Sequence, residues 1–210
     1  WFWDHVRISY LQRGKASIGE EEPIKQNDSL VRSIKAMPQL ESIHPFATKY
    51  AILKTTDEME GVLLKGLDQT YDSAHLKPFI QEGRWMTFND STYAREIVIS
   101  TYTASQLDLR LNDRVLIYFV RPDGTLRPDK LSIVGIYKTS IEEYDRTFAI
   151  GDLKLIRRLN GWSEDEIGGY EIFLKDYEQM GPVADAIHYN NLFPPQLSAK
   201  TARELYPNIF

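Results

Sequence analysis

Residues 95–137, REIVISTYTASQLDLRLNDRVLIYFVRPDGTLRPDKLSIVGIY, decide the fold of this 210-residue chain. The run 95–100 is rich in β-branched residues and predicts a strand, and residues 103–109 predict a short helix after it. Two further strands are predicted over 114–120 and 130–137, with a Pro-Asp-Gly turn between them. Short strands joined by short connections make this the β-rich region of the chain.

The stretches on either side alternate strands and helices. Before the β-rich region we expect strands over 5–10, 42–54 and 59–67, and a helix that Asn27 or Asp28 caps. After it we expect a helix capped by Asp152 and then a strand over 170–174. A second helix should follow, with Val183, Ala186 and Ile187 on one face, and the tail 198–210 should contain a short helix. The simplest layout is therefore a β-rich insert between two α/β halves, with the strand over 170–174 in one sheet with strands before residue 70.

Composition excludes several classes of protein. The net charge is −5 and the pI about 5.5, so the chain lacks the basic surplus of a nucleic-acid binder. It has no cysteine, which excludes disulfides, thiolate zinc sites and cysteine nucleophiles. No apolar run reaches the length of a membrane span, and the chain begins at Trp1, which we interpret as a processed protein or a piece of a longer one.

No motif in the sequence predicts catalysis or a bound cofactor. His5, His44, His75 and His188 have no partner at metal-ligand spacing, and we interpret them as surface or hydrogen-bonded strand positions. Phosphate loops, dinucleotide fingerprints and nucleophile elbows are absent from the sequence. The acidic run 142–145 is expected to lie on an extended or turning segment that faces solvent. We therefore expect no enzyme, no metal and no cofactor.

A set of short blocks resembles a known family. In order along the chain these are Gly83-Arg84-Trp85, Glu96-Ile97-Val98-Ile99-Ser100, Ala104 with Leu107 and Leu109, Asn112-Asp113-Arg114-Val115, and Ile133-Val134-Gly135-Ile136-Tyr137. Their order and spacing are similar to those of the periplasmic core domain of the MacB and FtsX superfamily of ABC permeases. Glu143-Tyr144-Asp145, Gly169-Tyr170-Glu171-Ile172 and the segment 61–68 resemble most the LolC/LolE lipoprotein-releasing permeases within it. These blocks can also be explained by local structure alone. Gly83 permits a tight connection, and Asn112 tolerates a left-handed turn position.

The resemblance implies an α+β fold with a discontinuous α/β porter-like subdomain and an inserted β-rich sabre-like subdomain. We place the first porter-like segment at residues 1–80, the sabre-like insert at 81–150 and the second porter-like segment at 151–210. The implied function is that of an extracytoplasmic domain of an inner-membrane permease that faces the periplasm and transmits ATP-driven motion to release lipoproteins. The implied partners are a second permease subunit, the same or related, a cytoplasmic ATPase and a periplasmic lipoprotein carrier.

The hairpin between the strands over 114–120 and 130–137 departs from the LolC pattern. It is shorter than the LolC hook that captures the carrier, and the basic positions beside that hook correspond here to Leu116, Pro128 and Asp129. No docking residue is therefore transferred from the family. The candidate partner-binding residues are those that the hairpin itself presents: Arg121, Leu126, Arg127 and Lys130.

Two alternatives to lipoprotein release remain open at this point. One is MacB-like efflux or FtsX-like regulation by a related permease. The other, from a different class, is a periplasmic small-molecule binding protein or enzyme, which a dominant apolar cleft with convergent polar groups would favour. If the chain is a permease domain, its two ends must return to one membrane. Residues near Trp3 and near Leu205 should therefore lie on the same side of the fold, with the hairpin over 121–130 away from them.

Overall fold

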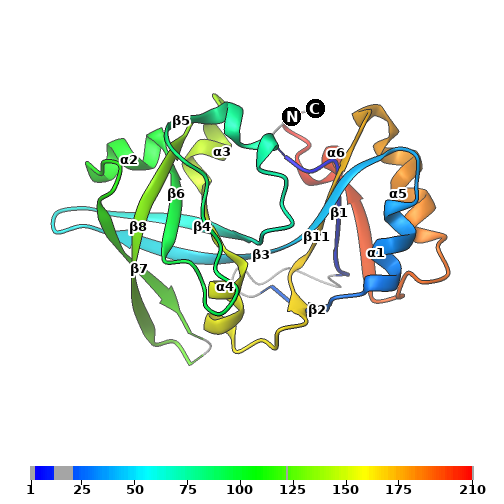
Figure 1. The fold of residues 1–210 in the computed structure, drawn as a ribbon, viewed down its shortest axis with the longest axis horizontal. Coiled ribbons are helices and arrows are strands. Elements are labelled where there is room, and N and C mark those ends of the chain that lie inside the picture. Colours follow the sequence, from blue (N-terminus) through cyan, green and yellow to red (C-terminus); the bar gives the residue numbers. More distant parts are fainter. Residues whose placement is uncertain (1–2, 12–20, 122, 210) are drawn as a thin grey trace. The chain divides into compact units, whose positions relative to one another are not determined.

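The computed structural model describes residues 3–11, 21–121 and 123–209 and consists of two compact units (Figure 1). The first unit combines Trp3–Phe46 with Asp165–Phe210, and the second is the contiguous stretch Ala47–Glu164. The first unit is thus discontinuous in sequence, and the second is inserted into it. The porter-like and sabre-like limits at residues 80 and 150 differ from these boundaries and stay a prediction.

The first unit is built on an antiparallel sheet with the strand order β12-β1-β11-β3. These strands are β12 (Leu197–Thr201), β1 (Val6–Tyr10), β11 (Gly169–Leu174) and β3 (Leu40–Lys54), of which the residues up to Phe46 belong to this unit. Because β11 pairs with both β1 and β3, the prediction that residues 170–174 share a sheet with strands before residue 70 is confirmed.

Helices of the first unit bury one apolar stripe each. In α1 (Asp28–Lys35) the Asn27 side chain accepts a hydrogen bond from the Leu30 amide, as predicted, and Leu30 and Ile34 are buried. Helix α5 (Met180–His188) follows the 3-10 turn η3 (Tyr177–Gln179) and buries Val183, Ala184 and Ile187. The prediction that Ala186 lies on the apolar face is wrong, because its side chain is exposed. The short helix α6 (Ala202–Leu205) follows β12, and β2 (Ile24–Lys25) pairs with β10 (Glu166–Ile167).

The second unit contains a closed ring of six strands. In ring order these are the remaining residues of β3, then β4 (Met59–Leu67), β9 (Phe148–Asp152), β6 (Glu96–Ser100), β8 (Leu126–Tyr137) and β7 (Arg114–Val120), which pairs back to β3. A further strand, β5 (Ile80–Gly83), pairs with β8. Alternate side chains fill the ring, as in other small barrels, with Leu53, Leu64, Ile117 and Phe119 fully buried.

Three helices accompany the ring: α2 (Thr101–Leu107), α3 (Glu142–Thr147) and α4 (Leu153–Asn160). The predicted cap of α4 is confirmed, because the Asp152 side chain accepts a hydrogen bond from the Lys154 amide. Helix α4 contacts β4 at Gly66, where a Cβ atom would lie 2.8 Å from the Cα atom of Leu153. Two 3-10 turns, η1 (Ser73–His75) and η2 (Lys77–Phe79), lead into β5.

Three expectations about local structure are wrong. The acidic run 142–145 is helical in α3, because the Tyr144 ring stacks on Phe148 at 4.4 Å and buries that side of the segment. The tail contains the strand β12 before its helix, since residues 197–201 pair with β1. Strand β8 begins at residue 126 rather than 130. The strand continues through Pro128, which lacks a backbone N–H. Strand β6 pairs with β8 only from Ser132 onward, so the edge of β8 at Pro128 forms no hydrogen bonds with β6 that the missing N–H could interrupt.

Candidate functional site

The four predicted partner-binding residues lie around the hairpin of β7 and β8. Leu126 pairs with Val120, and its side chain is 55% exposed. Lys130 is also exposed, whereas Arg127 is half-buried because it points to the opposite face of β8. Arg121 is exposed in the turn, where its amide donates to the carbonyl of Thr125. Leu126 and Lys130 therefore share one outward face, to which Arg127 does not contribute.

Three of the blocks that resemble a permease family meet at one place in the second unit, namely those that contain Gly83-Arg84, Glu96 and Gly135. Gly83 has a φ of +79°, and a Cβ atom there would lie 2.1 Å from the Val134 carbonyl oxygen. The next residue, Arg84, donates from Nη1 to Glu96 Oε1 at 3.2 Å and from Nη2 to Glu96 Oε2 at 2.5 Å. A Cβ atom on Gly135 would lie 2.5 Å from the Arg84 carbonyl oxygen. These motif residues hold a connection against the ring, which is an architectural role.

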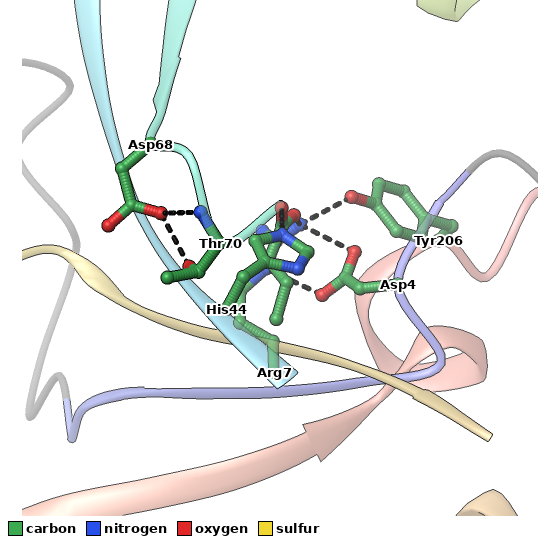
Figure 2. A network of polar contacts seen from close by, with 7 residues as sticks. Asp4, Arg7, His44, Asp68, Thr70 and Tyr206 are labelled. Carbon is green, nitrogen blue, oxygen red and sulfur yellow. Dashed lines mark hydrogen bonds and ion pairs between the residues drawn. The ribbon is translucent and has the colours of Figure 1, made fainter. Parts of the chain in front are cut away.

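The first unit contains a network of charged side chains in which Asp4, His44 and Glu171 are buried, whereas Arg7 and Tyr206 are partly exposed (Figure 2). Arg7 of β1 donates from Nε and Nη2 to the two carboxylate oxygens of Asp4, both at 3.0 Å. The same Nη2 donates to Tyr206 Oη at 2.7 Å and lies 3.4 Å from Glu171 Oε2. The other oxygen of Glu171 lies 2.9 Å from His44 Nε2. Asp4, His44 and Glu171 are each at most 3% exposed in their side chains.

The electrostatics of this network favour a permanently charged Arg7. Burial alone would lower the pKa of its guanidinium, but Asp4, Tyr206 and Glu171 outweigh burial and raise that pKa well above its ordinary value. The guanidinium also lies over the rings of Phe46 and Tyr206, at 5.1 and 5.8 Å from their centroids. A planar fork that satisfies two carboxylates and a phenol is a task for which Lys is a poor substitute.

The network ties together the first and last described segments of the chain. Tyr206 follows α6, and its ring lies 6.2 Å from that of Trp3. The Ala202 amide donates to the His5 carbonyl at 2.8 Å. The prediction that residues near Trp3 and near Leu205 lie on the same side of the fold is therefore confirmed. Sequence patterns did not reveal Arg7 or Tyr206 as partners, because they are 199 residues apart.

The interpretation of the histidines as surface or hydrogen-bonded strand positions fits His44, which lies in β3, and His188, which is exposed at the end of α5. It is wrong for His5, which is buried just before β1, and for His75, which lies in η1. His5 Nδ1 accepts from the Leu174 amide at 2.8 Å, and His188 Nε2 accepts from the Ala199 amide at 3.2 Å. His75 lies near the ring of Tyr71. Over residues 3–11, 21–121 and 123–209, no group of three or more His, Cys, Asp or Glu residues is arranged to hold a metal ion. None of the described helices combines the length and apolar character that a membrane crossing requires.

The fold is that of extracytoplasmic domains of ABC-type transporters. The extracellular domain of the noncanonic ABC-type transporter YknZ from Gram-positive bacteria superposes with a TM-score of 0.58 and 13% identity, over 94% of this chain and 100% of that one. The periplasmic region of MacB from Actinobacillus actinomycetemcomitans also gives a TM-score of 0.58, with 11% identity, over 98% and 92% of the two chains.

Comparison of the sequence leads to the family. The chain belongs to the MacB-like periplasmic core domain family, whose pattern it matches over residues 5–188. A curated relative is the lipoprotein-releasing system transmembrane protein LolE of Haemophilus influenzae, which is 22% identical over 162 residues. That alignment covers 74% of this chain and 38% of the relative, so the chain spans well under half of that protein's length. The chain is thus the extracytoplasmic domain of an ABC-type permease, as the sequence blocks predicted.

Proposed function

We propose that this domain belongs to an inner-membrane permease that releases lipoproteins, and that its work is mechanical rather than catalytic. The likeness to LolE supports the lipoprotein branch, because LolE is described as a component of a lipoprotein-releasing system. The observation that supports the mechanical role is the Arg7 network. It joins β1, near the beginning of the chain, to Tyr206, near its end. Motion that reaches either end would move the first unit as one body.

The buried position of the network explains why it can transmit force. Its hydrogen bonds are partly shielded from water and end on buried carboxylates, so they are costly to leave unmade. Removal of Arg7 would weaken the compensation of two buried carboxylates, those of Asp4 and Glu171, although His44 would still lie beside Glu171. Together with the pairing of β1 and β12, the network therefore resists separation of the two end segments.

The partners follow from the same proposal. A cytoplasmic ATPase would supply the motion through membrane segments, and a second permease subunit, the same or related, would complete the transporter. A periplasmic lipoprotein carrier would accept the cargo, and the hairpin residues Arg121, Leu126, Arg127 and Lys130 are the candidates for that contact. The side chains of Leu126 and Lys130 support it best, because both face outward.

MacB-like efflux is the second candidate, and the superposition on the periplasmic region of MacB favours it. The two candidates differ in cargo and can be separated by reconstitution. The full-length permease with its ATPase is placed in proteoliposomes that contain an acylated lipoprotein, and ATP-dependent transfer to a soluble carrier is measured. We expect transfer of the acylated form only. Equal handling of a soluble peptide, or no transfer of the lipoprotein, would favour efflux.

A further inference from the structure

The outward side of the ring carries a flat array of side chains on β4, β3, β7 and β8. Residues opposite one another in paired strands lie on the same face of a sheet, so the register defines three cross-strand rows. The first row is Met59, Lys54, Leu116 and Lys130, and the second is Gly61, Ile52, Tyr118 and Pro128. The third continues the two strand pairs by one step and consists of the pairs Leu63 with Tyr50 and Val120 with Leu126. We name these twelve positions the outer face.

The outer face is apolar although it is open to solvent. None of its twelve residues is buried, whereas the residues between them along the strands point into the ring, and those of β3 and β7 are buried throughout the array. Met59 is 64% exposed, Leu126 55%, and Tyr50 and Val120 52% each. With Leu116 they make five of the nine large apolar side chains that stand exposed in the described segments of the chain. Contiguous exposed apolar patches of a few hundred Å² are often functional and mark contact sites.

The size of the outer face indicates what kind of partner it fits. Strands lie about 4.8 Å apart and residues on one face about 6.7 Å apart, so the array covers about 400 Å². A stable interface between free proteins buries about 800 Å² on each side. The outer face is therefore the centre of a weak interface, which suits a partner already held nearby by a membrane.

Charge argues that this partner is neutral where it meets the face. The array contains two lysines and no carboxylate. The border of the first row contains Arg114 and the acids Asp57, Glu58 and Asp113. Together with the two lysines of that row, Arg114 makes three positive charges that balance the three negative ones. Such a border neither selects an acidic partner nor attracts an anionic membrane, and it does not repel a second copy of the same surface.

A two-fold axis along the second row makes the outer face complementary to itself. In such an isologous contact the first row of one copy lies over the third row of the other. Lys54 then faces Tyr50 and Lys130 faces Leu126, so no lysine meets a lysine, and an ammonium group over a tyrosine ring is attractive. Tyr118, in the second row, lies next to its own counterpart.

We propose that the outer face binds the same face of a second copy of this chain. The inference rests on the proposed function for one point, that a permease works as a pair of subunits and thereby holds two domains together. Linked domains experience an effective concentration in the millimolar range, which compensates for the small area. The contact would pair the two domains on the extracytoplasmic side of the transporter, and a carrier that binds Leu126 and Lys130 would compete with it.

The absence of cysteine from the chain permits a direct test. A single cysteine is introduced as Tyr118→Cys, and a control as Tyr189→Cys, which lies in the first unit at a side chain that is 87% exposed. Both variants of the full chain are oxidised at equal concentration. We expect Y118C to form the disulfide-linked dimer roughly tenfold faster than Y189C, because the proposed axis brings its thiols together. Equal rates would overturn the proposal.

Sedimentation of the cysteine-free chain gives a second readout. We expect reversible dimerisation as the concentration approaches about 1 mM, and its loss in Val120→Glu, which places a carboxylate in the array. A monomer at every concentration would contradict the proposal. Binding of the monomer to phosphatidylglycerol vesicles that V120E abolishes would assign the face to a membrane instead. Neither failure touches the permease assignment, which the transfer assay above tests separately.

Discussion

The two units bury their charges in different ways. In the first unit the buried carboxylates pair with basic side chains. Asp4 pairs with Arg7, which is close in sequence, whereas the contacts of Glu171 with Arg7 and His44 span 164 and 127 residues. In the second unit the buried carboxylates mostly accept hydrogen bonds from backbone amides. Asp145 accepts from Thr139 and Ser140, and Asp152 accepts from Ala94 and Lys154. The discontinuous unit is thus closed by charge pairs, and the contiguous unit uses its acids to hold turns and helix ends.

The largest effect should come from breaking the long-range network. Arg7→Ala removes the cation beside the buried Asp4 and one of the two basic groups beside Glu171, and we expect a loss of about 3–5 kcal/mol in the free energy of unfolding. Urea denaturation followed by circular dichroism measures it. The matched control is Arg32→Ala on α1, where the arginine contacts Ser29 in an exposed position. A loss in R7A no greater than the roughly 0.5 kcal/mol expected for R32A would refute the role of the network.

Two glycines test how much the close backbone contact at Gly83 contributes to the stability of the second unit. Gly83→Ala must relieve both a left-handed φ of +79° and a Cβ that lies 2.1 Å from the Val134 carbonyl oxygen, so we expect about 2–4 kcal/mol of destabilisation. Gly124 has a φ of +82° but open space around its Cβ position. Gly124→Ala should therefore cost about 1 kcal/mol, from the backbone term alone. Equal costs in thermal unfolding would mean that the close approach at Gly83 is unimportant.

Asp152 provides a pH-dependent test of the backbone-paired acids. Burial raises the pKa of its carboxyl above the ordinary value, although the amides of Ala94 and Lys154 act in the opposite direction. The folded state therefore holds the proton to higher pH than the unfolded state, and stability falls as pH rises from the ordinary value through the raised one. Asp152→Asn removes this fall and loses one acceptor, so we expect about 1–3 kcal/mol of destabilisation, larger at pH 4 than at pH 7. A loss that does not vary with pH would contradict the assignment.

The smallest effect is expected on the outer face of the ring. Leu126→Ser removes an exposed apolar group and one cross-strand contact with Val120, which should change the free energy of unfolding by about 0.5 kcal/mol. Ile117→Ala, on the buried side of β7, should cost about 2–5 kcal/mol. Chemical denaturation of both variants compares the two faces. A large loss in L126S would show that the outer face contributes to folding rather than to association.

Local signals in the sequence were sufficient for much of the fold. Asn27 and Asp152 sit before apolar residues at helical spacing, and both cap the predicted helices. The alternation of predicted strands and helices also indicated that residues 170–174 join the sheet of the first strands, and β11 pairs with β1 and β3. The Arg7 network could not be predicted, because its members occupy ordinary strand and tail positions and meet only through tertiary pairing. The outer face was missed because strands with apolar residues on both sides, such as residues 50–53 and 115–120, look the same whether one side is open or buried.

The central claim is that the Arg7 network couples the chain ends to the work of the permease, and Arg7→Lys tests it most directly. Lysine keeps the positive charge beside Asp4 and Glu171 but cannot reproduce the bidentate fork or the contact with Tyr206. The measurement is the number of ATP molecules hydrolysed per lipoprotein transferred by the reconstituted permease, with circular dichroism to establish that the variant is folded. We expect ATP hydrolysis to continue while transfer falls, so the ratio rises about tenfold for a coupling loss near 1.4 kcal/mol. An unchanged ratio in a folded R7K variant would contradict the claim.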